Sequence, residues 1–82
     1  MKTLIDSKWY DTETSELIYD YWNGRDFADY NFEIEQLYQS NSGEYFLYCY
    51  GGRKSKYYNC RIISPMSMEE AQIWILKKGM RN

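Results

Sequence analysis

The sequence predicts an α+β fold: an antiparallel sheet of three to four strands with two helices, in the order β-α-β-β-β-α. Three observations support it. Apolar and polar residues alternate at the start of segment 32–39, and apolar or aromatic residues fill 45–50, on either side of a turn-forming segment. Residues 12–22 carry apolar side chains at helical spacing, and residues 67–79 begin with a capping motif. With 82 residues in all, we expect a single domain over residues 1–82.

The N-terminal part is expected to contain one strand and the first helix. Residues 2–10 are predicted as a strand with a turn or bulge at Asp6-Ser7. Over 12–22, Asp11 or Thr12 would cap the helix, and Asn23-Gly24 would end it. The apolar face of this helix would consist of Thr14, Leu17, Ile18, Tyr21 and Trp22.

Three further strands are expected between residues 32 and 64. Phe32–Gln39 alternates until Leu37-Tyr38, where we expect a bulge, and Asn41-Ser42-Gly43 is a hairpin turn. Residues 44–50 have apolar or aromatic side chains on both faces, which predicts a central strand with cover on both sides. After a basic loop at 53–56, the chain should return as a strand over residues 57–64.

The second helix has the most specific local signature. Ser67 and Glu70 form the S-x-x-E capping box, in which each side chain accepts a hydrogen bond from the other residue's backbone N–H. Pro65 is expected to end the preceding strand, and Gly79 to end the helix. Lys77 and Lys78 suit the negative end of the helix dipole.

The composition narrows the possible functions. Aromatic residues make up 20% of the chain, including ten Tyr, which argues against disorder. The chain has no His, and this excludes Ser-His-Asp and Cys-His catalysis and the histidine zinc motifs. Cys49 and Cys60 match no metal spacing and are expected to be two thiols. We therefore expect no enzyme, no metal and no cofactor.

Charge is distributed unevenly along the chain. The net charge is only −2, but residues 9–52 carry −8 and residues 53–82 carry +5. Such asymmetry predicts either two opposite surface patches or halves that neutralise each other in the fold. Both alternatives remain open from the sequence.

Two candidate binding surfaces follow from these segments. Tyr, Trp and Arg are the residue types that dominate protein interfaces, and ten Tyr exceed what a small core can hide. The acidic and aromatic candidate for a protein partner consists of Asp20, Asp26, Phe27, Asp29, Tyr30, Glu33 and Glu35. The alternative candidate, for single-stranded nucleic acid, interleaves bases with stacking rings. It consists of Tyr50, Arg53, Lys54, Lys56, Tyr57, Tyr58 and Arg61.

No apolar run is long enough to span a bilayer, and the N-terminus becomes polar too early for a signal peptide. These features predict a cytoplasmic protein with no membrane partner.

An ordered set of short motifs carries a resemblance. The set consists of Tyr10-Asp11-Thr12-Glu13-Thr14, Trp22-Asn23-Gly24, Leu37-Tyr38, Gly43, Tyr45-Phe46-Leu47, Gly51-Gly52, Ser55-Lys56-Tyr57, Pro65-Met66-Ser67, Glu69-Glu70-Ala71 and Trp74. Over about residues 9–76 the chain resembles short uncharacterised proteins of bacterial phages, plasmids and integrative elements. It departs from them at Asn59-Cys60-Arg61, where they carry longer, more polar insertions. The resemblance implies no activity. It implies a genomic setting in which small acidic proteins often block host defences, as anti-CRISPR proteins do.

Together these expectations describe an interaction protein of a mobile element, in the cytoplasm of the bacterial host. It would inhibit a defence complex such as CRISPR-Cas by steric or charge-mimetic occlusion, through a Cas or other defence protein as partner. The alternative is a small nucleic-acid-binding accessory or regulatory protein that uses residues 50–61. The target and the oligomeric state stay open.

Overall fold

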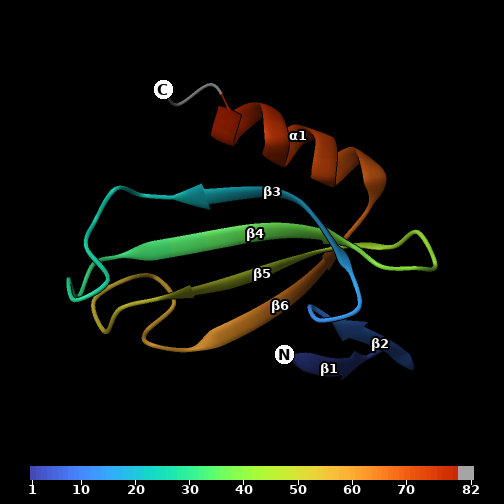
Figure 1. Ribbon diagram of the computed structural model, residues 1–82, viewed down its shortest axis with the longest axis horizontal. Coiled ribbons are helices and arrows are strands. Elements are labelled where there is room, and N and C mark those ends of the chain that lie inside the picture. The colour runs from blue at the N-terminus through green and yellow to red at the C-terminus, as the bar shows by residue number, and fades with distance from the viewer. Residues whose placement is uncertain (80–82) are drawn as a thin grey trace.

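The computed structural model describes residues 1–79, which form six strands and one helix. The hairpin of β1 (Lys2–Ile5) and β2 (Lys8–Asp11) is a separate two-stranded sheet. The main sheet is an antiparallel meander of β3 (Glu16–Trp22), β4 (Glu33–Gln39), β5 (Tyr45–Gly51) and β6 (Arg61–Met66), and α1 (Met68–Gly79) follows it. Figure 1 shows these four strands side by side, with α1 near β3 and the hairpin near β6. The predicted α+β class is confirmed, with one helix and two sheets instead of two helices and one sheet.

The predicted helix over residues 12–22 is wrong, because Glu16–Trp22 forms the edge strand β3. Its apolar residues also fit a period of two: Tyr19 and Tyr21 face α1, and Ile18 and Trp22 are exposed. Aromatic and β-branched side chains favour a strand in so short a segment. Pairing along β4 then supplies the backbone hydrogen bonds that a helix would have made internally.

The bulge lies one strand away from its predicted position. Leu17 pairs with Tyr38 and Tyr19 with Leu37, so the extra residue is Ile18 in β3, whereas β4 pairs with β5 without interruption. Leu37 and Tyr38 are therefore regular strand residues, on opposite faces of the sheet.

The turn predicted at Asp6-Ser7 is confirmed, but it divides the N-terminal segment into two paired strands instead of interrupting one strand. Asp6 and Ser7 adopt φ of 49° and 66°, the left-handed conformation of a tight two-residue turn, and Ile5 pairs with Lys8 across it. The hairpin is bound to Glu44, the residue before β5, by the Lys8 Nζ–Glu44 Oε1 ion pair of 2.6 Å and by the Tyr10 hydroxyl, which donates to Glu44.

The central strand β5 is covered on both faces, as predicted. Phe46 and Tyr48 pack with Tyr10 of the hairpin and Ile63 of β6. The helix covers the other face, where Trp74 and Ala71 pack on Leu37. Phe46 and Leu37 are fully buried, one in each of these two small cores.

The turns that connect β4, β5 and β6 lie close to their predicted positions. The turn at 41–43 and the basic loop after Gly51-Gly52 are confirmed, but β6 starts at Arg61 instead of Tyr57 and continues through Pro65. Proline is tolerated there because β6 is an edge strand. Within residues 1–79, no helix has the length and apolar character needed to cross a membrane.

The capping box of α1 is confirmed. The Ser67 Oγ accepts from the Glu70 N–H at 3.1 Å, and the Glu70 Oε1 accepts from the Ser67 N–H at 2.8 Å. Replacing Ser67 with alanine is expected to lower the free energy of unfolding by about 0.5–2 kcal/mol, because a helix N–H loses its acceptor. Urea denaturation measures this, with the exposed Ser64→Ala as a matched control. An unchanged midpoint and slope for Ser67→Ala would show that the cap contributes nothing.

Candidate binding site

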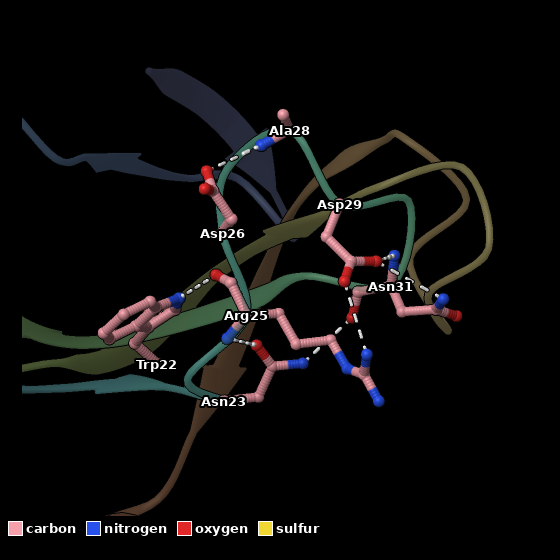
Figure 2. Close-up of polar contacts among 7 residues, drawn as sticks. All are labelled: Trp22, Asn23, Arg25, Asp26, Ala28, Asp29 and Asn31. Carbon is pink, nitrogen blue, oxygen red and sulfur yellow. Dashed lines mark hydrogen bonds and ion pairs between the residues drawn. The ribbon is translucent and has the colours of Figure 1, made fainter.

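The β3–β4 loop, residues 23–32, is held in shape by short-range polar contacts (Figure 2). Asn, Asp and Trp side chains bind the loop's own backbone, as Asx turns do. These bonds are Trp22 Nε1 to Arg25 O, Asn23 Nδ2 to Asn31 O, Arg25 N to Asn23 Oδ1, Ala28 N to Asp26 Oδ1 and Asn31 N to Asp29 Oδ1, at 2.6–3.3 Å. A loop bound in this way has little freedom left to lose when a partner docks.

Two aromatic side chains project from this loop. Phe27 is 68% exposed and Tyr30 is 53% exposed, although both are large apolar groups. The Phe27 ring stacks on the buried Phe32 with 4.8 Å between ring centroids. Phe27 therefore packs on a buried ring and still exposes most of its own side chain.

The β5–β6 loop lies directly against the β3–β4 loop. Gly52 N–H donates to Phe32 O at 3.0 Å, and Lys54 N–H donates to Tyr30 O at 2.8 Å. A Cβ on Gly52 would overlap the Tyr30 carbonyl, so only glycine permits this close approach. The contact places the Arg53 guanidinium 5.5 Å from the centre of the Tyr30 ring.

A pocket of about 350 Å³ lies between these two loops. Its lining includes four aromatic side chains and two guanidinium groups, and we call it the aromatic–arginine pocket. These six side chains are Phe27, Tyr30, Phe32, Tyr50, Arg53 and Arg61. The four aromatic side chains come from the acidic segment, residues 9–52, and the two arginines from the basic segment, residues 53–82.

The structure separates the predicted acidic and aromatic set. Asp20 and Asp26 are exposed with Phe27 and Tyr30, whereas Glu35 is buried on the helix-covered face. Asp29 is bound by its own loop: the Asn31 N–H, together with the Arg25 guanidinium at 3.3 Å, lowers the pKa of its carboxyl.

Glu33 is half-buried, and its carboxylate accepts from the Lys56 N–H at 3.5 Å. Within residues 1–79, Asp20 and Asp26 are therefore the two exposed acids of the set without an ion pair, and Asp26 directly precedes Phe27.

The predicted basic and aromatic set also divides in two. Tyr50, Arg53 and Arg61 line the pocket, and Lys54 and Tyr58 are exposed on the loop. The other two members, Lys56 and Tyr57, turn toward Glu35. Arg81, which contributes to the positive charge of this half, lies outside the described residues.

Glu35 is the centre of a buried polar cluster that the sequence did not reveal. Its carboxylate accepts from the Tyr57 hydroxyl at 2.5 Å and from Trp74 Nε1 at 2.9 Å. It also forms ion pairs with Lys56 Nζ at 3.2 Å and Lys78 Nζ at 3.3 Å. The cluster thereby joins β4, the β5–β6 loop and α1.

Burial alone would raise the pKa of Glu35, but these four partners outweigh it and lower the pKa from 4.5 to about 2. Burial and the hydrogen bond to Glu35 raise the pKa of Tyr57. The available signal was the position of Glu35 two residues before Leu37, which puts both side chains on one strand face. Glu33 lies on the same face, and two carboxylates on one strand face are more typical of a face open to solvent.

The two cysteines are free thiols, as expected. Cys49 is buried, and burial raises its pKa to about 11, whereas Cys60 is exposed on the loop. Within residues 1–79, no group of three or more Cys, Asp or Glu side chains is arranged to hold a metal ion.

Comparison with known proteins identified no matching family model, no similar curated protein and no similar solved structure.

Proposed function

We propose that the protein is an interaction module that inhibits a bacterial defence complex, such as CRISPR-Cas, by steric occlusion. The observation that carries the proposal is the pair of exposed rings, Phe27 and Tyr30, on a loop ordered by its own hydrogen bonds. Exposing two large aromatic groups in solution has no benefit for folding. It suits a surface that becomes buried against a partner.

The loop has the features of an interface centre. Aromatic side chains and Arg supply most of the binding energy at protein interfaces, and here Trp22, Arg25 and Tyr30 lie on one short segment. Because the loop is already ordered, little conformational entropy is lost on docking.

Charge supports a steric role more than mimicry of a nucleic acid. Asp20 and Asp26 are exposed near the loop, and such rim charges speed encounter with a basic partner. The remaining acids of the predicted surface are bound internally, above all Glu35. The choice of a defence complex as target rests on the genomic setting that the sequence resemblance implies.

The test is protection of phages in bacteria. Expressed in a panel of strains that each restrict phage by one defence system, the protein should restore plaque formation in at least one strain. Phe27→Ala/Tyr30→Ala should abolish protection there, because losing an interface anchor costs about 2 kcal/mol, roughly 30-fold in affinity.

Trp9→Ala is the matched control, since Trp9 is a 59% exposed aromatic residue on the hairpin. It should leave protection intact. Failure to protect any strain in the panel would refute the proposed function, and equal loss in both variants would refute the role of the loop.

A further inference from the structure

We propose that the aromatic–arginine pocket binds one nucleotide of a single-stranded nucleic acid. The base would stack on the rings of Phe27 and Tyr50, and Arg53 and Arg61 would bind the flanking phosphates. Stacking surfaces combined with cationic side chains are how proteins hold single strands without reading their sequence.

The rings are fixed in place before any ligand arrives. Phe32 stacks on Phe27 and meets the Tyr50 ring edge-on at 5.9 Å between centroids. Phe32 is 6% exposed, so both rings pack against a residue that the core holds in place. The two rings are therefore in position before a ligand binds, and their flat faces suit stacking with a planar group.

The two guanidiniums are available for an anion. Among residues 1–79, no carboxylate lies within ion-pair distance of Arg53 or Arg61. Arg61 lies over the Tyr50 ring at 5.0 Å and donates one hydrogen bond, from Nη1 to the Tyr48 hydroxyl at 2.6 Å. Its other N–H groups remain for a phosphate. Asp29, the acid that lines the pocket, is already paired with Arg25.

Size and surroundings favour one unit of a strand. A volume of about 350 Å³ is at the small end of ligand pockets, enough for a single nucleotide. From the pocket, a cross-strand row of Arg61, Tyr50, Ile34 and Trp22 continues across the sheet face opposite α1. A strand can follow this row, but a paired and stacked base of a duplex cannot enter the pocket.

The inference goes beyond the proposed function and does not depend on it. Phe27 and Tyr30 belong to both surfaces, so the test uses the arginines, which belong to the pocket alone.

The test is fluorescence anisotropy with 5′-labelled oligothymidylate and oligouridylate of eight nucleotides. Arg53→Gln and Arg61→Gln should each weaken binding by about tenfold, as expected for loss of one charge-assisted contact. Wild-type affinity should fall with salt with a logarithmic slope of about −1.4 for two phosphates, and of about −0.7 in each variant.

Lys77→Gln is the matched control, because it removes the same charge from the exposed side of α1. It should bind like the wild type. Arg61→Lys keeps the charge but loses the planar group over Tyr50, and should bind more weakly than the wild type. Among the described residues, the Arg53 side chain makes no hydrogen bond and contacts only the Tyr30 ring, so Arg53→Gln tests the site even if Arg61→Gln fails to fold.

Three results would overturn the inference: no saturable binding at low salt, equal weakening by Lys77→Gln, or a duplex bound as tightly as the single strand. Competition by poly-glutamate as strong as by the oligonucleotide would show a site for anions in general and would also overturn it. Competition by thymidine monophosphate at the strength of the oligonucleotide would overturn the strand in favour of a free nucleotide.

Discussion

Replacing Glu35 with glutamine should lower the free energy of unfolding by about 3–5 kcal/mol at neutral pH, the usual cost of removing one partner from a buried ion pair. Glutamine has the shape of Glu35 but leaves two ammonium groups without their counter-charge. Lys78 is the more affected of the two, since its side chain is 14% exposed. A domain of this size has a total stability of about 4–12 kcal/mol, so the variant will approach the limit of folding.

Urea denaturation of the variant and the wild type measures this difference. The control is Glu33→Gln, two residues away on the same face, whose carboxylate has one long contact to a backbone N–H. We expect a change within about 0.5 kcal/mol for this half-buried neighbour. Equal midpoints and slopes for Glu35→Gln and the wild type would show that the cluster does not stabilise the fold.

The pH dependence has a definite sign. The pKa of Glu35 is about 2 in the folded state and 4.5 as the ordinary value, so its ionised form is the one that the fold stabilises. This contribution, about 3 kcal/mol, is present above pH 4.5 and is lost as the pH falls through 2. The gap between wild type and Glu35→Gln should therefore close with acid over that range. A gap that stayed constant from pH 7 to pH 2 would contradict the depressed pKa.

Replacing Phe46 with alanine should cost about 3–5 kcal/mol, the range for a buried Phe that leaves a cavity. Phe46 is fully buried between the Tyr10 ring, edge-on at 5.4 Å, and the Tyr38 ring, stacked at 5.4 Å. It is the fully buried member of the cluster through which the hairpin packs on the sheet. The variant should therefore also lose amide protection in β1 and β2.

Chemical denaturation and hydrogen exchange measure the two effects. Phe27→Ala is the same substitution at a 68% exposed position and should cost less than about 1 kcal/mol. A similar loss in both variants would mean that burial does not govern the cost. Retained protection in the hairpin would mean that it folds without Phe46.

Local signals in the sequence predicted those elements that local interactions hold together. The capping box defined the start of α1 because its hydrogen bonds join residues three apart. The turn at 41–43 and the two-sided strand β5 were predicted for the same reason, since period and turn chemistry lie within a few residues.

The segment before Asn23 was predicted wrongly because two periods fit it. Ile18, Tyr21 and Trp22 match a helix face, and Tyr19 and Tyr21 match a strand face. Two tertiary contacts stabilise the strand over the helix. β4 pairs with Glu16–Trp22, and the Trp74 ring meets the Tyr19 ring edge-on at 5.8 Å. Neither β4 nor Trp74 is near this segment in the sequence, so no local pattern distinguishes the strand from a helix.

The residues of the candidate sites were mostly visible in the sequence, but their grouping was not. Composition identified Phe27 and Tyr30 in one set and Arg53 and Arg61 in another. The close approach of the loops at Gly52 brought the two sets to one pocket. The sequence assigns Glu35 to one surface and Lys56 and Tyr57 to the other, whereas the structure places all three together, in contact through the Glu35 carboxylate.

The sequence by itself determined the α+β class, helix α1 with its cap, the central hairpin of β4 and β5, and the excess of aromatic and charged groups available for binding. These depend on short-range hydrogen bonds and on side-chain periodicity, which a linear pattern records. The tertiary structure alone decided the strand β3, the two-sheet arrangement, the burial of Glu35 and the aromatic–arginine pocket. Each of these depends on contacts between segments far apart in the chain, where the free energy comes from burial and pairing with a distant partner.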